Sequence, residues 1–420
     1  MTSSPYYDAL ETRSSDQRNT DFFAALQVQI ANAKKNAPFF TSALSHISAE
    51  AITDRTQLAT LPVTRKSDLM EHQKQSAPLG GLNTCEPGKL KRIFQSPGPI
   101  YDAEGHGDDW WRTARALYAA GIRKGDILHN TFSYHLTPAG VMIETGATEL
   151  GCAVVPAGVG NTELQVRAIA DIRPTGYIGT PSFLKIILEK ALEMGVDVSS
   201  LTKGLVGGEA FMPALRQDLI NFGVTCGQIY ASADIGSIAY ESSAQEGLIV
   251  DEKLIVEIVR PGTGDPVEDG QVGEVVVTTF APEYPLIRFA TGDLSATLAG
   301  VSPCGRTNMR LKGWMGRADQ TTKVKGMFIH PKQIADIIKR HPEILKARLT
   351  VDQRGGVDVM MLACEIHHLH DIEGGSNALT DRIAASIQVV CKVRGDVKYE
   401  ASGSLANDGK VIDDLRKFDT

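Results

Sequence analysis

The chain has 420 residues, of which 42% are hydrophobic and 22% are charged, an ordinary composition for a globular protein. This length exceeds what one hydrophobic core usually supports, so we expect two or more domains. A net charge of −7 argues against a nucleic-acid-binding surface. The chain has no apolar run of membrane-helix length, and its N-terminus, MTSSPYYDALETRSSDQ, lacks an apolar signal core, so we expect a cytoplasmic protein outside the membrane.

Residues 15–75 have a polar-amphipathic pattern, and the clearest helical period lies in DFFAALQVQIANAKKN. The segment 94–105, FQSPGPIYDAEG, has two prolines and two glycines and therefore predicts a loop. Phosphate-binding loops are rich in Gly, Ser, Thr and Lys. This segment has Ser96, but it lacks a lysine and carries Asp102 and Glu104. Its ability to hold a phosphate is therefore an open question.

Strands and helices alternate from about residue 125 at the spacing of βαβ units, which predicts a largely parallel sheet. Asn161 or Thr162 is expected to cap a helix, and Pro181 is expected in the first turn of the next helix. The predicted strands are DILHNTF, GCAVVPAG, TGYIGT, LTKGLVGGE and TCGQIYAS, and the predicted helices are TPAGVMIETGATELG, NTELQVRAIADI, PSFLKIILEKALEMG and MPALRQDLINFG.

The composition changes twice beyond this region. In residues 252–282, EKLIVEIVRP and GEVVVTTF are joined by a Gly/Pro/Asp-rich connection, which indicates an antiparallel hairpin or small barrel. After LKGWMGRADQTTKVKG, strands and helices again alternate, but in the order of a small α+β domain. We therefore predict a large domain over 1–318 and a small domain over 319–420.

The six cysteines lie far apart without a CxxC pair, which argues against a disulfide framework or a structural zinc site. His367, His368 and His370 follow a predicted strand, and we interpret them as part of a solvated loop rather than as metal ligands.

Several short motifs follow one another along the chain: GGE (207–209), IYASAD (229–234), YPLIRFATGD (284–293), GRAD (316–319), KVKG (323–326) and GSLANDGK (403–410). From about residue 90 onward this ordered set resembles the adenylate-forming superfamily of acyl-CoA synthetases, and most closely the phenylacetate-CoA ligase family. The resemblance implies an α/β fold with a large N-terminal domain of mostly parallel sheets, a small barrel-like β part, and a small mobile α+β C-terminal domain. It also implies ATP, Mg²⁺ and CoA as reactants or cofactors, and domain alternation between two reaction steps.

The resemblance assigns a nucleotide site. Asp293 would accept hydrogen bonds from both ribose hydroxyls, Arg317 would reach the ribose or a phosphate, and Tyr230 would stack on adenine. A turn cap, a surface ion pair and a core tyrosine are the respective structural alternatives. The full nucleotide-binding set that the resemblance implies is Ser96, Gly207, Gly208, Glu209, Tyr230, Ala231, Ser232, Asp293 and Arg317.

The resemblance assigns four further roles. Lys410 matches the lysine that stabilises charge during acyl adenylation, although an ordinary surface lysine is the alternative. Asp319 occupies the hinge position and Gly326 the edge of the CoA passage. Asp234 stands where the family usually has a magnesium-binding glutamate, and Glu209 is a weaker second candidate.

The segment 94–105 stands where the family has a Ser/Thr/Gly-rich loop with a lysine. Carboxylates there would repel a triphosphate. Three alternatives stay open: Lys89, Lys91 or Arg92 reaches the phosphates; Asp102 or Glu104 holds magnesium; or the loop contacts the acyl substrate. Ala231 and Ala233 also replace the Gly and the Ser or Thr that are common in the family.

By family position, Phe132, Tyr134 and His135 would line an acyl pocket, and such aromatic walls suit an aryl or arylacetic acid. A core or helix-capping role is the alternative for His135.

Three functions fit the sequence. The first is an ATP-dependent, AMP-forming acid–CoA ligase for an aromatic or other small carboxylate. The second is an adenylating enzyme that passes the acyl group to an amine or a carrier protein. The third is a degenerate protein that binds a nucleotide or acyl-CoA without turnover. Lys410 favours an active enzyme, whereas the altered loop favours the third function. A homodimer is left open.

Overall fold

The computed structural model describes residues 4–96, 100–318, 322–325, 327–354, 357–366, 375–406 and 410–416. The chain divides into two compact units, one of Met1–Thr291 with Ser295–Trp314 and one of Gly292–Leu294 with Met315–Thr420. The main division between the units lies just before the predicted boundary at Asp319. Asp319 itself lies outside the described residues, so the functional boundary stays a prediction.

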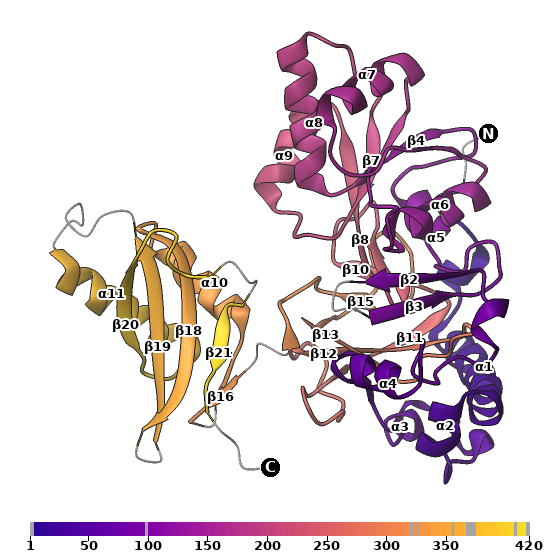
Figure 1. Cartoon of the computed structure of the whole chain (residues 1–420), viewed down its shortest axis with the longest axis horizontal. Coiled ribbons are helices and arrows are strands. Elements are labelled where there is room, and N and C mark those ends of the chain that lie inside the picture. The colour runs from indigo at the N-terminus through magenta and orange to yellow at the C-terminus, as the bar shows by residue number, and fades with distance from the viewer. Residues whose placement is uncertain are drawn as a thin grey trace. The chain divides into compact units, whose positions relative to one another are not determined.

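A nine-stranded mixed sheet, in the order β14-β15-β10-β9-β8-β7-β6-β4-β5, organises the first unit (Figure 1). The strands from β5 to β8 run parallel, as the βαβ spacing predicts, and β9 turns back antiparallel to β8. The strands are β4 Ile127–Asn130, β5 Ala153–Pro156, β6 Gly176–Gly179, β7 Lys203–Val206, β8 Thr225–Ser232, β9 Gly236–Glu241, β10 Leu248–Val250, β14 Thr297–Leu298 and β15 Arg310–Leu311.

Helices cover both faces of the parallel strands. Helices α7, α8 and α9 pack through one apolar cluster, and α5 and α6 pack through another. Thr180 caps α8 by accepting from Phe183 N, whereas Asn161 precedes α7 without a side-chain capping bond. The helices are α5 Ala114–Ala119, α6 Ala139–Glu149, α7 Thr162–Ile172, α8 Pro181–Met194 and α9 Pro213–Asn221.

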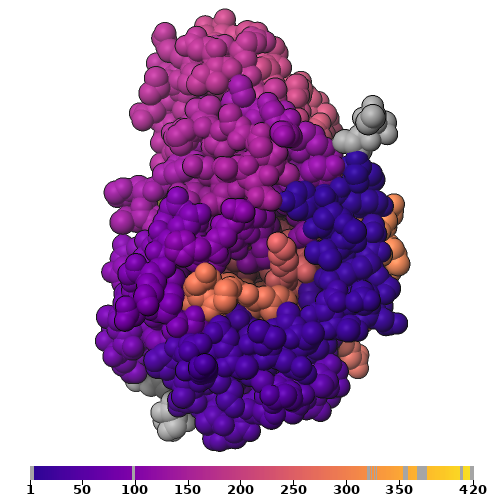
Figure 2. Space-filling model, turned by 90° about the vertical axis from the view of Figure 1, so that its right-hand side faces the viewer, coloured from indigo at the N-terminus to yellow at the C-terminus, as the bar shows by residue number. Residues whose placement is uncertain are grey.

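A second sheet, in the order β1-β13-β12-β11, shares a large core with the N-terminal helices. Strands β11 and β12 pair antiparallel, which confirms the predicted hairpin. Figure 2 shows the indigo N-terminal segment at one end of the first unit and the magenta residues of the parallel-sheet region at the other. The elements are α1 Ser15–Asn36, α2 Pro38–Ala43, α3 Arg55–Leu58, α4 Leu69–Gln75, β1 Thr64–Arg65, β11 Leu254–Val259, β12 Gly273–Thr279 and β13 Phe289–Ser295, with short 3₁₀ turns at Ala9–Thr12, Ala49–Ala51, Lys66–Asp68 and Pro87–Lys89.

The prediction of a loop over 94–105 is wrong. Strands β2 (Arg92–Ser96) and β3 (Ile100–Glu104) form an antiparallel hairpin, with Arg92 opposite Glu104 and Ser96 opposite Ile100. Pro97 and Pro99 are not among the residues that pair in this hairpin, and they lie outside the described residues. Tertiary contacts support the hairpin, because the Gln73 side chain bonds both backbone groups of Tyr101 and Gln95 N donates to Leu136 O.

The second unit is a small α+β fold, as its sequence predicts. Its four-stranded sheet, in the order β20-β19-β18-β21, packs with two helices around one apolar core, and β16 and β17 form a separate hairpin. Across the described residues, no helix is both long and apolar enough to cross a membrane. The elements are β16 Thr322–Val324, β17 Met327–Ile329, α10 Pro331–Arg340, β18 Ile344–Arg354, β19 Val357–Ile366, α11 Gly375–Cys391, β20 Asp396–Ala401 and β21 Ile412–Asp414.

Candidate functional site

The carboxyl ends of β4, β6, β7 and β8 bring several predicted site residues to one edge of the parallel sheet. In open α/β sheets this edge is where ligands usually bind. A Cβ added to Gly208, which follows β7, would lie 3.7 Å from Cε1 of Phe132 and 3.8 Å from Cγ2 of Thr180. The structure thus places an expected nucleotide residue next to an expected acyl-pocket residue.

The two glycines after β7 are required by local geometry. A Cβ at Gly207 would lie 2.8 Å from Cγ2 and 2.9 Å from the carbonyl oxygen of Ile229, so β8 leaves no room for a side chain. Gly208 has a φ of 79°, which glycine adopts without strain. Packing against the neighbouring strand therefore explains Gly207 directly, and its approach to a purine stays a prediction.

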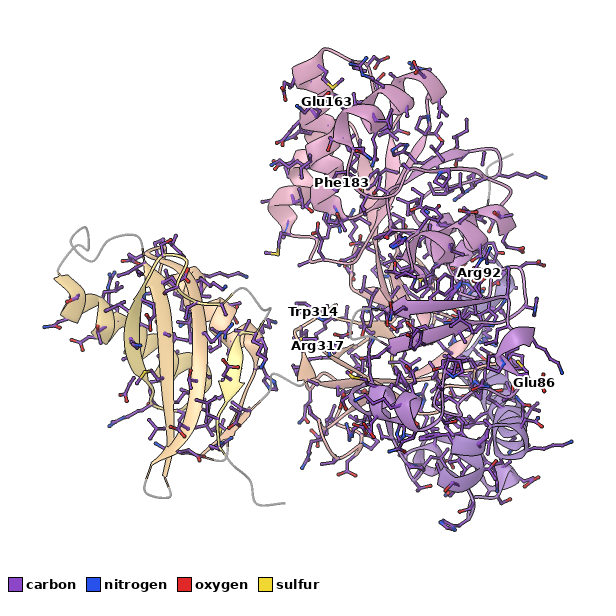
Figure 3. All side chains as sticks on the ribbon, in the orientation of Figure 1. Glu86, Arg92, Glu163, Phe183, Trp314 and Arg317 are labelled. Atoms are coloured by element: carbon purple, nitrogen blue, oxygen red, sulfur yellow. The ribbon has the colours of Figure 1, made fainter. Side chains whose placement is uncertain are left out.

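Glu209 has a structural partner in the fold. Its Oε1 accepts from Ser182 N at 2.7 Å, in the first turn of α8. A carboxylate at a helix N-terminus is stabilised by the free N–H groups and by the helix dipole. Phe183, labelled in Figure 3, lies in this same turn. The predicted nucleotide role of Glu209 is not tested by this contact.

Tyr230, Ala231 and Ser232 end strand β8. Tyr230 is half-buried and packs against the N-terminal core, and the pairing of β8 with β9 shifts register between Tyr230 and Ala231. Such irregularities re-aim side chains at the ends of strands. Ser232 Oγ accepts from Ile235 N at 3.3 Å, so its hydroxyl stabilises the turn that carries Asp234.

Asp234 is buried and paired with a lysine that the sequence did not single out. Lys66 Nζ lies 2.5 Å from Asp234 Oδ2, although the two residues are 168 positions apart. Asp234 Oδ1 has no hydrogen-bond partner among the described residues. That open oxygen suits a hard cation such as Mg²⁺. No short sequence motif predicts a role for Lys66, because its contact with Asp234 forms only in the folded chain.

The two carboxylates of hairpin β2–β3 have different environments. Glu104 is fully buried, with both carboxylate oxygens 3.0 Å from Arg92 Nη1 and one oxygen 3.4 Å from Lys91 Nζ. These cations therefore neutralise Glu104 in the structure; Arg92 is labelled at the start of β2 in Figure 3. Asp102 is also fully buried, and burial, followed by the neighbouring Asp234 carboxylate, raises its pKa well above the usual range, although Ser96 nearby acts in the opposite direction.

Ser96, the predicted phosphate ligand, is buried within the same hairpin. Its Oγ donates to Ile100 O at 3.3 Å, so its hydroxyl is used inside the turn. Gly98 lies outside the described residues. In the described part of the chain, no group of three or more His, Cys, Asp or Glu side chains is placed to hold a metal. A cation bound here would take its remaining ligands from other oxygens, such as phosphate and water.

The expected acyl-pocket residues follow β4. Tyr134 packs over the start of α6, since a Cβ at Gly140 would lie 2.7 Å from its ring. The Tyr134 hydroxyl accepts from Nδ2 of Asn130, a fully buried residue that the sequence did not single out, at 2.8 Å. His135 is exposed, which removes the core alternative for its ring. Burial and Glu144 together raise the pKa of Tyr134, so its hydroxyl stays protonated.

The second unit joins the TGD and GRAD motifs. Arg317 Nη1 lies 3.3 Å from Asp293 Oδ1, and the two residues also form a backbone bridge. The Arg317 guanidinium, labelled in Figure 3, lies against Gly292, where a Cβ would be 2.7 Å from Nη2. The structure therefore brings together two residues that were predicted to bind the ribose.

Lys410 is an exposed side chain directly before β21. Its side chain is 61% exposed, and Nζ lies 3.7 Å from Asp413 Oδ1. An exposed ion pair of this kind contributes little to stability. The position is therefore compatible with a charge that acts on a ligand. The predicted hinge Asp319 and the CoA-passage residue Gly326 lie outside the described residues, as do His367, His368 and His370.

Comparison with known proteins shows which enzymes this chain resembles. The model of the AMP-binding enzymes matches residues 112–280, which include the carboxyl-edge residues from Phe132 to Asp234. Phenylacetate-coenzyme A ligases are similar over most of the chain: that of Aromatoleum evansii is 29% identical, covering 86% of this chain and 84% of the relative, and that of Thermus thermophilus is 29% identical, covering 90% and 88%. The chain is therefore similar to the AMP-binding enzymes over residues 112–280 and to the phenylacetate-CoA ligases over most of its length. The resemblance stated from the motifs is confirmed.

Solved structures share the fold of this chain. An open conformation of 2-hydroxyisobutyryl-CoA ligase, in complex with 2-HIB-AMP and CoA, superposes with a TM-score of 0.84 at 22% identity, covering 98% of this chain and 95% of that one. The amide bond synthetase McbA from Marinactinospora thermotolerans superposes with a TM-score of 0.52 at 16% identity, covering 80% and 69%. The predicted adenylate-forming fold is therefore confirmed.

Proposed function

We propose that the protein is an AMP-forming acid–CoA ligase that activates a small carboxylic acid with ATP and transfers the acyl group to CoA. The observation that carries this proposal is the similarity to phenylacetate-CoA ligases over most of both chains. The arrangement of Phe132, Gly208 and Tyr230 at the carboxyl edge supports it, because an acyl group and a nucleotide must meet there.

The proposed reaction has two displacements. A carboxylate oxygen attacks the α-phosphorus of ATP, the bond to the bridging oxygen breaks, and pyrophosphate leaves. The CoA sulfur then attacks the acyl carbon, loses its proton and expels AMP. The protein supplies alignment and charge: Tyr230 stacks on adenine, Asp293 accepts from the ribose hydroxyls, and Lys410 stabilises negative charge developing between the carboxylate and the phosphate.

We propose an aromatic or similarly small acid as the substrate. Phe132 offers an apolar wall beside Gly208, and Tyr134 is fixed by its hydrogen bond from Asn130. The related enzymes act on phenylacetate, so arylacetic acids come first in a screen, and short hydroxy acids come next because of the similar 2-hydroxyisobutyryl-CoA ligase fold.

The test is pyrophosphate release from ATP and Mg²⁺ across a panel of these acids, with and without CoA. Acid-dependent release, with thioester formed only when CoA is present, supports the ligase. Release that is followed by acyl transfer to an amine or a carrier protein, but not to CoA, would replace CoA as the acceptor. Binding of AMP or acyl-CoA without release for any acid would contradict the proposal and favour a degenerate binding protein.

A further inference from the structure

The connection between β20 and β21 carries Lys410 and runs from one edge of the four-stranded sheet to the other. The strands of this sheet lie in the order β20-β19-β18-β21, so β20 and β21 are its two edges. The described residues of the connection are 402–406 and 410–411. Backbone N–H and C=O groups outside a strand ladder need other partners. The side chains that supply these partners therefore help to decide where Lys410 lies.

The alternation of side chains along β18 and β19 places three charged groups on one face of this sheet. Ala347 and Leu349 of β18 belong to the apolar core that the helices share. Lys346 and Arg348 occupy the alternate positions and therefore lie on the opposite face. Glu365 of β19 lies directly opposite Lys346 in the strand register, so its side chain is on that face as well.

Two of these groups hold the backbone shortly before Lys410. Lys346 Nζ donates to Leu405 O at 3.3 Å and to Ala406 O at 2.9 Å. The buried Glu365 accepts from Leu405 N at 2.6 Å through its Oε1. Hydrogen bonds to a charged group are stronger than those between neutral groups. Both a donor and an acceptors of this short segment are thus fixed by side chains of the central strands.

Arg348 contacts the chain on both sides of Lys410. Its Nη2 donates to Ala406 O at 3.0 Å, and its Nη1 lies 3.1 Å from Asp413 Oδ2. The other oxygen, Asp413 Oδ1, lies 3.7 Å from Lys410 Nζ. The planar fork of a guanidinium suits two acceptors at once. One side chain, only 13% exposed, thus links the backbone before Lys410 to the carboxylate that lies next to the Lys410 ammonium.

We propose that Arg348 is a positioning residue for Lys410, assisted by Lys346 and Glu365. This role rests on the proposed function, in which Lys410 stabilises charge during adenylation. Arg348 acts through Lys410, by holding Ala406 and by sharing Asp413 with it. A misplacement of about 1 Å in a catalytic group can lower a rate about 100-fold, so such support has a measurable effect.

The experiment follows full-length variants in the two half-reactions, with the best acid of the panel and its synthetic adenylate. Arg348→Gln should lower kcat for pyrophosphate release by about tenfold to 100-fold, with little change in the KM for ATP. Thioester formation from the adenylate and CoA should keep its wild-type rate, because that step does not use the charge of Lys410. Arg382→Gln, which breaks an arginine–carboxylate pair with Glu343 in the same unit, is the control and should release pyrophosphate normally.

Two further variants separate positioning from general damage. Arg348→Lys should retain more pyrophosphate release than Arg348→Gln, since it keeps the charge although it lacks the fork. If Arg348 acts through Lys410, the double variant Lys410→Ala/Arg348→Gln should be no slower than Lys410→Ala alone. A further loss of about tenfold in the double variant would show that Arg348 acts independently, which would overturn the proposal.

Thermal unfolding of each variant identifies any that do not fold. If Arg348→Gln is one of them, Glu365→Gln, which weakens the contact with Leu405 N, is judged by the same readouts. The proposal is overturned if the wild type is active and Arg348→Gln releases pyrophosphate equally fast, or if it slows both half-reactions equally. A wild type without acid-dependent release would instead contradict the ligase, and the positioning role would fall with it. The two failures are distinguishable, because one occurs in the variant and the other in the wild type.

Discussion

The end of the parallel strands and the hairpin β2–β3 are built on different physical principles. Gly207 and Gly208 directly follow β7, and Tyr230 lies near the end of the adjacent strand β8. Their positions therefore depend on backbone geometry. In the hairpin, Asp102 and Glu104 depend on cations and neighbours from distant segments. A site made by local backbone shape is visible in a motif, whereas a site made by charge pairing is visible only once the chain has folded.

The largest expected effect is the loss of pyrophosphate release when Lys410, which lies in neither the strand ends nor the hairpin β2–β3, is replaced. Lys410→Ala should lower acid-dependent pyrophosphate release by about 100-fold or more, since it removes a charge that stabilises the transition state. AMP affinity, measured by calorimetry, should change little. Lys398→Ala is the matched control, because that lysine lies in the same unit with a similarly exposed side chain, 59% against 61%. Equal turnover in both variants would remove Lys410 from the mechanism.

The next effect concerns the nucleotide. Asp293→Ala should weaken AMP binding by about 1–3 kcal/mol, the range for losing hydrogen bonds to a charged group. Arg317 loses its carboxylate partner in the same variant, so Asp293→Asn, which keeps an oxygen acceptor, should lose less. Calorimetric titration with AMP distinguishes the two. An unchanged AMP affinity in Asp293→Ala would contradict the ribose assignment.

A single methyl group added at the end of β7 should destabilise the strand ends. Gly207→Ala should lower the free energy of unfolding by about 1–3 kcal/mol, because the added Cβ overlaps Ile229 in the neighbouring strand. Gly88→Ala is the control, since nothing lies within 4 Å of a Cβ there. Urea denaturation measures both variants. If Gly207→Ala is as stable as Gly88→Ala, the strand end tolerates side chains. The strand ends would then not depend on backbone geometry in the way that distinguishes them from the hairpin β2–β3.

The smallest expected effect is the difference in stability between variants of Glu104 and Asp102, the two carboxylates of the hairpin β2–β3. Glu104→Gln should lower the free energy of unfolding by about 1–2 kcal/mol, because the charge-assisted hydrogen bonds that Arg92 donates to this side chain are weakened. Asp102→Asn should be neutral or stabilising, since burial and the neighbouring Asp234 carboxylate already disfavour the charged form of Asp102. Thermal unfolding of the two variants compares them. A larger loss in Asp102→Asn would show that its carboxylate is already satisfied.

Secondary structure was predictable where periodicity was strong. The alternation that indicated βαβ units is present as strands β4 to β8 with their helices, and EKLIVEIVRP and GEVVVTTF pair as predicted. The hairpin β2–β3 was missed because its prolines and glycines were weighed over the whole segment, although the prolines lie between the paired residues. Strand β9 was also missed, because no pattern of its own marked where β8 turns back.

The α/β class could be predicted from local periodicity, and the residues expected at the nucleotide edge from the resemblance that the ordered motifs carry. Which charged side chains lie close together depends on the folded chain. It paired Lys66 with Asp234 across 168 residues, gave Glu104 two cations and left Asp102 buried beside another carboxylate. The physical reason is that burial and distance set the strength of an electrostatic interaction, and both are properties of the folded chain.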